Sequence, residues 1–392
     1  MTTPAPAPLR VAHIGFLSDP AGRPPAQLLA AWPTLVDVAE AAAAAGARVS
    51  VIQACAEQAQ LRRSGVDYHF LPFDAQRLED RARLATLLRE LRTQLLHVHG
   101  LDFCREVRAL AALLPQLPLI LQDHASRVPR LWRRPLWRRA FSAADALAFC
   151  AAEQAQPFVT AGVLPLRTAL YAIPESTSRF TPGDQQQARR LTGLHGDPAV
   201  LWVGHLDANK DPLTALAGVS EAARQLPDLR LWCCFGAAPL LPQVEERIRH
   251  DARLRERVRL IGRVPHAQIE QFMRAADVFV LASHHEGSGY ALIEALACGL
   301  PPVVTDIPSF RALTGAGAVG ALWPCGDAPR LSAALQALAA RGSAAARAAV
   351  RAHFDREIAL PALGAKLVAM YAAVLERRRW AQAATQRGRR AH

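Results

Sequence analysis

Short apolar runs alternate with helical stretches from one end of the chain to the other. In the first half strands of this kind are predicted at residues 11–16, 47–53, 95–100 and 119–124. Runs of this length are typical of parallel strands that helices cover on both faces. A helix predicted at 27–45 joins the first two runs. The pattern therefore predicts an open α/β sheet.

The second half of the chain repeats this pattern. Strands are predicted at residues 200–204, 231–236, 258–264 and 278–282, and alanine-rich helices follow further on. A length of 392 residues is too great for one ordinary hydrophobic core and suits two domains. We therefore predict two successive α/β domains.

The most informative stretch is the loop at 284–289, between a predicted strand and a predicted helix. Gly287 and Gly289 allow close approach to the backbone, and the N–H groups at the helix start favour an anionic or hydroxyl-rich ligand. Glu286 lies in the loop, and Glu294 lies in the helix, roughly 6 Å further along its axis. Both carboxylates can accept hydrogen bonds from sugar hydroxyls. The alternative is that Glu286 is solvated and Glu294 is a surface residue.

The loop and helix resemble the signature of a known enzyme family. Residues 286–289 and Glu294, eight positions after Glu286, resemble the E-x7-E motif of family 4 glycosyltransferases. The resemblance implies a GT-B fold, with two Rossmann-like domains facing across a cleft and a C-terminal helix that crosses back to the N-terminal domain. It also implies a retaining enzyme that uses a nucleotide sugar. It covers roughly residues 10–375 and is strongest after Val200.

A second motif supports this resemblance. Lys210 matches the lysine of the family pattern Gly-Arg-Leu-x-x-x-Lys, whereas His205 stands in place of the arginine. In the family these two cations hold the donor diphosphate, and histidine is a weaker, pH-dependent cation. A further departure is Glu-Ser-Thr-Ser at 175–178, where the family usually has Asn-Gly-Val-Asp. That departure affects the expected hinge and donor contacts.

The resemblance implies a role for each matching position. Glu286 would hold the donor sugar and Glu294 the ribose, and the segment ending at Val264 would contact the base. Gly22 follows the first strand, where the family often meets the donor phosphates, although a plain turn is the competing interpretation. The predicted catalytic residues are His124, Glu286 and Lys210; the predicted donor-binding residues are Gly22, Gly204, His205, Lys210, Arg263, Val264, Glu286, Gly287, Ser288, Gly289, Tyr290 and Glu294.

The same resemblance divides the chain into segments. Its two domains are Rossmann-like, the first for the acceptor and the second for the nucleotide sugar. The predicted bounds are 1–8 for a disordered N-terminus, 9–178 for the first domain, 179–198 for an interdomain segment, 199–358 for the second domain, 359–379 for the crossover helix and 380–392 for a basic tail.

Two observations bear on metals and cofactors. His97 and His99 share one face of a predicted strand, but the sequence shows no third ligand beside them, so no metal site is predicted. The chain contains no D-x-D motif, so we expect no acidic magnesium clamp and a metal-independent reaction. No cofactor is expected beyond the nucleotide-sugar donor, such as a UDP- or GDP-sugar.

The charge of the chain indicates an anionic partner. The formal net charge is +12, and residues 127–139 carry six arginines, two tryptophans and no acid. This basic stretch is interpreted either as a face resting on an anionic membrane or as an ordinary helix with its tryptophans packed inward. No nucleic-acid-binding module accompanies the charge, so nucleic acid is not an expected partner.

Localisation is expected to be cytoplasmic, with peripheral contact at the inner face of the membrane as the open alternative. No apolar run of the roughly 18 residues needed to span a membrane and no signal peptide are evident. The seven cysteines show no CxxC spacing and suit a reducing compartment.

Taken together, the resemblance predicts a glycosyltransferase that moves a sugar to the hydroxyl of a glycan or lipid-linked acceptor, in the assembly of cell-surface polysaccharide or glycolipid. Two alternatives stay open. One is another GT-B sugar-nucleotide enzyme, such as an epimerase or phosphorylase. The other is a catalytically weak GT-B protein that serves as a binding or partner subunit.

Overall fold

The computed structural model describes residues 7–74, 77–165, 168–340 and 343–390. The chain forms two compact units, which we call the N-terminal unit (up to Ser176, together with Leu360 onward) and the C-terminal unit (Thr177–Ala359). Residues 1–6, predicted to be disordered, and 391–392 of the predicted tail lie outside the described residues. Two α/β units confirm the predicted fold class.

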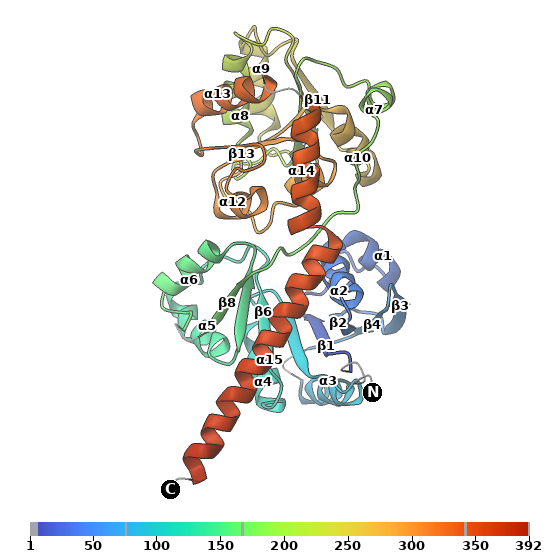
Figure 1. Ribbon diagram of the computed structural model, residues 1–392, viewed down its shortest axis with the longest axis vertical. Helices are drawn as coiled ribbons and strands as arrows, with labels where there is room; N and C mark the ends of the chain where they lie inside the picture. The colour runs from blue at the N-terminus through green and yellow to red at the C-terminus, as the bar shows by residue number, and fades with distance from the viewer. Residues whose placement is uncertain (1–6, 75–76, 166–167, 341–342, 391–392) are drawn as a thin grey trace, which may run out of the picture. The chain divides into compact units, whose positions relative to one another are not determined.

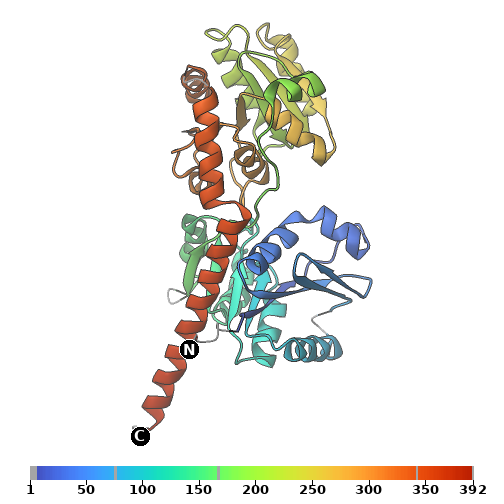
Figure 2. The same cartoon turned by 45° about the vertical axis from the view of Figure 1, so that its right-hand side comes forward.

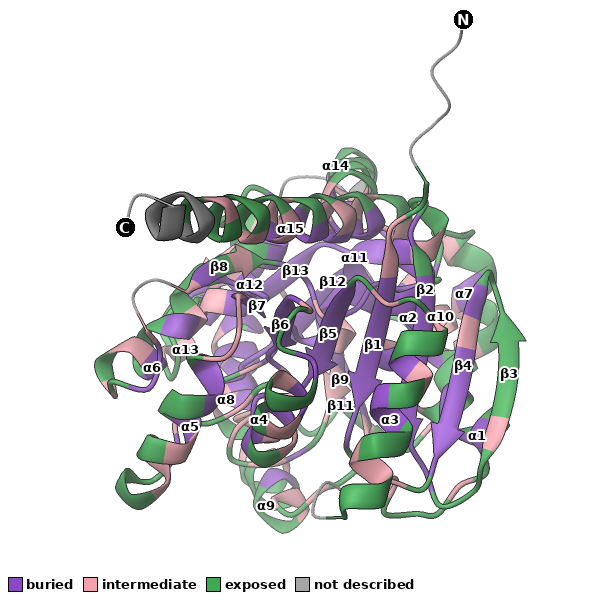
Figure 3. Cartoon of the chain, turned by 90° about the horizontal axis from the view of Figure 1, so that it is seen from below, coloured by how far each residue is buried: buried purple, intermediate pink, exposed green. Residues whose placement is uncertain are grey.

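The N-terminal unit is built on an eight-stranded sheet of order β3-β4-β2-β1-β5-β6-β7-β8. Only β3 pairs antiparallel, and it lies at the exposed edge, as Figure 3 shows in green beside the buried purple strands. The strands are β1 (Arg10–Gly15), β2 (Arg48–Ala54), β3 (Ala59–Arg63), β4 (Val66–Leu71), β5 (Leu95–His99), β6 (Leu119–Gln122), β7 (Ala146–Phe149) and β8 (Ala169–Ala172).

The single helix predicted at 27–45 is divided into two helices in the structure. The stretch 27–45 contains Pro33, which has no backbone N–H, and the chain turns at Trp32 (φ −118°, ψ 71°) between the two. The helices are α1 (Pro25–Ala31), α2 (Pro33–Ala44), α3 (Leu78–Glu90), α4 (Cys104–Leu113), η1 (Leu131–Arg133), α5 (Arg134–Phe141), η2 (Ala152–Ala155), α6 (Gln156–Thr160) and α15 (Leu360–Arg390).

Helix α15 follows the C-terminal unit in sequence but belongs to the N-terminal unit, as predicted for a helix that crosses back (Figures 1 and 2). Leu363, Leu367 and Tyr371 on one face are buried in the core beside α2. Gly364 permits this approach, because a Cβ there would lie 2.2 Å from the carbonyl oxygen of Ala41. The predicted boundary at 379 is wrong, since the helix runs on to Arg390.

A stretch that includes α15 contradicts the expectation that no apolar run is long enough to span a membrane. Within the described residues, Ala344–Ala384 is long and apolar enough to cross a membrane by length and composition alone. The buried face of α15, however, packs into the core of the N-terminal unit. Core packing accounts for part of this apolar character, since 39% of the most apolar window is buried.

The C-terminal unit contains a six-stranded parallel sheet of order β11-β10-β9-β12-β13-β14. Its strands are β9 (Ala199–Gly204), β10 (Arg230–Phe235), β11 (Val258–Gly262), β12 (Val278–Leu281), β13 (Pro302–Thr305) and β14 (Ala321–Trp323). Its helices are α7 (Gln185–Thr192), α8 (Pro212–Ala222), α9 (Leu241–His250), α10 (His266–Ala275), α11 (Tyr290–Ala297), α12 (Pro308–Thr314), α13 (Ala328–Ala339) and α14 (Ser343–Glu357).

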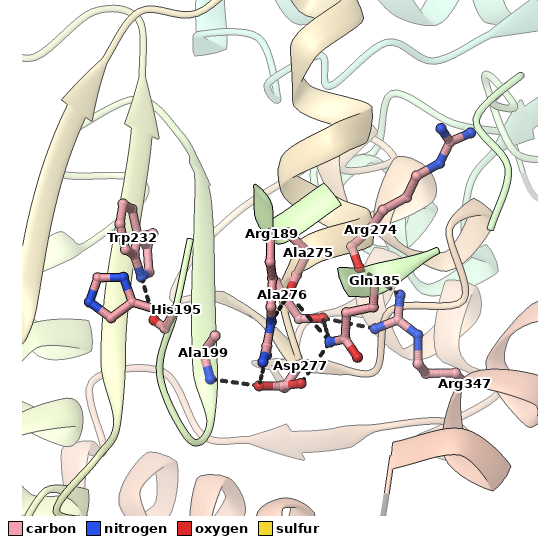
Figure 4. A network of polar contacts seen from close by, with 10 residues as sticks. All are labelled: Gln185, Arg189, His195, Ala199, Trp232, Arg274, Ala275, Ala276, Asp277 and Arg347. Atoms are coloured by element: carbon pink, nitrogen blue, oxygen red, sulfur yellow. Dashed lines mark hydrogen bonds and ion pairs between the residues drawn. The ribbon is translucent and has the colours of Figure 1, made fainter. Parts of the chain in front are cut away.

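The segment 179–198, predicted to lie between domains, belongs to the C-terminal unit and contains α7. Figure 4 shows how Asp277, just before β12, fastens it. The carboxylate of Asp277 accepts hydrogen bonds from Arg189 at 2.7 Å, Gln185 at 2.8 Å and the backbone N–H of Ala199 at 2.8 Å. A half-buried carboxylate with three hydrogen-bond donors fixes the helix to the sheet. The predicted domain boundary is therefore corrected to Ser176/Thr177.

Candidate active site

Two loops meet at the carboxyl ends of the adjacent parallel strands β9 and β12. The N–H of His284 donates to the carbonyl of Asn209 at 2.8 Å, and the side-chain amide of Asn209 donates to the carbonyl of His285 at 2.9 Å. His284 also bonds to Asp211 at 3.1 Å. These contacts join the loops 205–211 and 283–289. Open α/β sheets bind ligands at this edge.

Lys210 and Glu286, both predicted catalytic residues, form an ion pair across these loops. Their side chains are only 18% and 12% exposed. The backbone N–H of Lys210 donates to Asp207 at 2.9 Å, which fixes the turn that carries the lysine. The structure therefore rejects the alternative in which Glu286 is simply solvated. An ammonium group has three N–H donors, so it can hold Glu286 and a phosphate oxygen together.

Glu294, one turn into α11, is 2% exposed and accepts a hydrogen bond from His266 at the start of α10. Burial raises the pKa of the Glu294 carboxyl, against the opposing effect of His266. The hydrogen bond to Glu294 raises the pKa of His266. Glu294 is therefore not a surface helix residue. Sequence reasoning missed His266, although it lies just two positions after the predicted base-contact residue Val264.

The loop that precedes α11 has a fixed backbone. Gly289 caps the helix with φ +82°, and a Cβ there would lie 2.4 Å from the ring of Phe310. Only glycine fits such a position. Gly287 and Ser288 are buried and Tyr290, the first residue of α11, is half-buried. Backbone N–H groups at a helix start attract anions.

The other predicted donor residues of the C-terminal unit lie at or just after the ends of β9 and β11. His205 is exposed, and its Nδ1 accepts from the N–H of Ala237 at 3.1 Å, which leaves Nε2 as the hydrogen-bond donor in this arrangement. Gly204 ends β9, and a Cβ there would make ordinary contacts, so packing does not require glycine. Arg263 and Val264 directly follow β11. Their roles towards a donor stay predictions.

In the N-terminal unit, His124 begins a chain of buried hydrogen bonds. It bonds to Glu175 at 2.5 Å through Nδ1 and to His99 at 3.0 Å through Nε2. From there the chain continues from His99 to His13 at 3.1 Å, from His13 to Tyr371 at 3.0 Å and from Tyr371 to His97 at 2.8 Å. Glu175, a departure from the family pattern, is thus the partner of the predicted catalytic histidine.

Burial determines how this chain is protonated. It lowers the pKa of His13, His97 and His99 well below the usual value, so these imidazoles are neutral at pH 7. An ionised carboxylate only accepts hydrogen bonds, so Nδ1 of His124 donates to Glu175. Where Nε2 of His124 accepts from Nδ1 of His99, each later ring donates towards His124. The chain fixes the tautomer of His124.

These histidines also revise the metal expectation. His13 supplies the third ligand that the sequence did not show, and one nitrogen from each of His13, His97 and His99 lies within 4.8 Å of the others. The rings of His97 and His99 are stacked at 4.7 Å, however, so their in-plane lone pairs do not converge on one point. In this arrangement the cluster fits a hydrogen-bonded network better than a metal site.

A pocket of about 710 Å³ opens beside His124 in the same unit. Arg127, Arg130 and Arg133 line it, together with Trp132 and Trp137. Trp137 is 1% exposed, whereas Trp132 is 74% exposed, so the interpretation in which the tryptophans pack inward holds for Trp137 and not for Trp132. Gly22, by contrast, lies in a plain turn in which its N–H donates to the carbonyl of Asp19 at 3.0 Å.

Comparisons with known proteins agree with this geometry. Residues 197–341 match the family described as "Glycosyl transferases group 1". A D-inositol 3-phosphate glycosyltransferase of Geodermatophilus obscurus is 30% identical over 50% of this chain and 46% of its own length. A GDP-mannose:cellobiosyl-diphosphopolyprenol alpha-mannosyltransferase of Xanthomonas campestris is 26% identical over 66% of this chain and 69% of its own length. The chain thus spans about half to two thirds of the curated relatives it matches.

A solved structure extends the likeness to the whole fold. The glycosyltransferase of Rickettsia africae superposes with a TM-score of 0.71 and 11% identity, covering 93% of this chain and 99% of that one. The fold predicted from the E-x7-E resemblance is therefore confirmed. Residues 197–341 thus match the glycosyl transferases group 1 family, in a chain with the fold of the GT-B glycosyltransferases.

Proposed function

We propose that this protein transfers a glycosyl group from a nucleotide-diphosphate donor to an acceptor hydroxyl, with retention of configuration. The observation that carries the proposal is the Lys210–Glu286 pair on two joined loops, with Glu294 buried in the helix that follows the second loop, all within the residues that match the group 1 family. At the carboxyl ends of parallel strands, cations suit the diphosphate of a nucleotide sugar, and carboxylates suit the hydroxyls of its ribose and its transferred sugar.

Lys210 supplies the first element of the mechanism. As the bond between the anomeric carbon and the diphosphate oxygen breaks, the electron pair leaves with the diphosphate. A cation and N–H groups fixed in advance stabilise that growing charge and lower the barrier. In this proposal Lys210, the N–H groups at 288–290 and one N–H of His205 act on the diphosphate. None of these groups needs a metal ion, so the reaction is proposed to be metal-independent.

The two glutamates hold the donor at opposite ends. Glu286 accepts from hydroxyls of the transferred sugar while it keeps Lys210 in place. Glu294 accepts from the ribose hydroxyls. Because His266 already donates to Glu294, the ribose either shares this carboxylate with His266 or displaces it. His266 also lies 6.2 Å from the ring of Tyr290, between centroids, so the pair borders the start of α11.

The acceptor is proposed to bind the N-terminal unit, in the pocket beside His124. The hydrogen bond to Glu175 orients His124, and a fixed tautomer presents the same edge of the ring to every acceptor. A glycan or lipid-linked acceptor, used in the assembly of surface polysaccharide or glycolipid at the cytoplasmic face of the membrane, is consistent with the basic lining of this pocket.

The test is a turnover assay of the full chain against a panel of UDP-, GDP- and ADP-sugars, with donor hydrolysis as the readout where no acceptor is supplied. Release of one nucleoside diphosphate supports the proposal. The competing function, a binding subunit without catalysis, is favoured by His205 in place of the family arginine. Tight donor binding with no release would support that function instead.

A further inference from the structure

The pocket beside His124 is more basic than a site for neutral sugar hydroxyls requires. Three guanidinium groups line it, from Arg127, Arg130 and Arg133, against one carboxylate, that of Asp102. Burial raises the pKa of Asp102, and the positive charge of Arg133 opposes that rise. Arg127 and Arg130 therefore give the pocket a net positive field.

The backbone that carries these arginines is held in place. Asp123 is buried, and its carboxylate accepts the backbone N–H of Ser126 at 2.9 Å. Ala125 adopts φ +61°, which turns the chain directly after His124. On the far side, Trp137 is buried against Phe141 and anchors α5. The arginines thus project from a defined loop, and the pocket of about 710 Å³ has the size of a small-molecule site.

We infer that this pocket binds a phosphate or diphosphate group carried by the acceptor. The inference rests on the proposed function, because it assigns the chemistry of the acceptor at that same site. A guanidinium group binds phosphate oxygens through two parallel N–H donors, which makes arginine the side chain suited to this task. When the arginines bind the anionic group, a neighbouring hydroxyl of the acceptor lies on the side of the pocket that His124 lines.

Exposed apolar side chains border the arginines. Leu131 and Trp132 are both 74% exposed, and the guanidinium carbon of Arg133 lies 5.9 Å from the centre of a Trp132 ring. An apolar chain attached to the phosphate would find a contact there. The shared chemistry is the anionic group, and its source is either a soluble phosphate ester or a lipid-linked diphosphate.

The experiment measures binding and does not depend on turnover. Inorganic pyrophosphate is titrated into the full chain by calorimetry while a mixture of UDP, GDP and ADP keeps the donor site filled. We expect one binding event. Arg127→Gln and Arg130→Gln should each weaken it by about tenfold or more, the loss of a charge-assisted hydrogen bond. Arg138→Gln, an exposed arginine of α5 outside the pocket with the same change in charge, should leave it unchanged.

Absence of pyrophosphate binding, or equal weakening by Arg138→Gln, would overturn the inference. Farnesyl diphosphate distinguishes the two sources: tighter binding than pyrophosphate, lost in Trp132→Ala, assigns a lipid-linked acceptor, and equal affinity assigns a soluble one. A third outcome is that the chain binds vesicles of phosphatidylglycerol but does not bind pyrophosphate. The arginines would then form a membrane-binding surface, and the inference of a phosphate site in the pocket would be rejected. Arginine-dependent binding in a chain that transfers no sugar would reject the proposed function and leave this site standing.

Discussion

Acidification should unfold the N-terminal unit through its buried histidines. Burial lowers the pKa of His13, His97 and His99, whereas in the unfolded chain each returns to about 6.5. The unfolded state therefore binds more protons below that value. The stability that depends on these neutral rings is fully present above about pH 7 and is lost as the pH falls towards the folded pKa values.

The magnitude follows from the number of rings. Each additional proton bound by the unfolded state changes the free energy of unfolding by about 1.36 kcal/mol per pH unit. Three histidines give a slope of about 4 kcal/mol per pH unit below pH 6, against a total stability of about 5–15 kcal/mol for a typical domain. Among the neighbouring groups, His124 further lowers the pKa of His97 and of His99. Tyr371, whose pKa burial raises well above its usual value, stays neutral throughout.

The assay is hydrogen exchange of peptides from β1 and β5 between pH 7.5 and pH 5, corrected for the intrinsic exchange rate. His97→Gln removes one titrating ring and should reduce the slope by about a third, since each ring contributes equally. His250→Gln, on an exposed histidine of α9, is the matched control and should keep the wild-type slope. A flat profile, or an unchanged slope in His97→Gln, would refute the assignment of buried neutral imidazoles.

The other predictions concern the donor site. Glu294→Gln keeps the volume of a buried side chain but removes its charge, so the dissociation constant of the donor nucleotide should rise by about 10- to 100-fold in calorimetry; an unchanged value would remove Glu294 from the site. Glu286→Gln should lower kcat more than donor affinity in the same assay, and the reverse pattern would contradict its place beside the transferred sugar. Activity should survive EDTA, whereas loss with EDTA and recovery with magnesium would reject the metal-independent mechanism. His205→Arg should tighten donor binding through bidentate contact, and weaker binding would show that the imidazole does not face the diphosphate.

The sequence predicted the elements whose signals are local. Apolar runs located the strands, and the glycines near 287 located a loop whose backbone only glycine can adopt at Gly289. The E-x7-E spacing identified Glu286 and Glu294 as candidate site residues without any information on their hydrogen-bond partners. The same patterns misplaced the boundary near 177, because a glutamine- and arginine-rich stretch carries no apolar signal although Asp277 fastens it to the sheet.

The contacts that a local pattern could not predict are those between distant residues. His13 and His97 are adjacent because β1 and β5 pair in register, and Tyr371 reaches them from the last helix of the chain. Nothing in the spacing of a single strand reveals this meeting. His266 was missed for the same reason, since its importance comes from Glu294 on another helix. Tertiary pairing, not propensity, creates these sites.

The most direct test of the proposed transferase is release of the nucleoside diphosphate by Lys210→Met, compared with wild type and with Lys366→Met, a change of the only other lysine in the chain. Methionine removes the cation and keeps an unbranched side chain. Because Lys210 is proposed to stabilise the charge on the leaving diphosphate, the account predicts a loss in kcat of about 100-fold or more in Lys210→Met and none in Lys366→Met. Equal turnover in all three proteins would contradict the account.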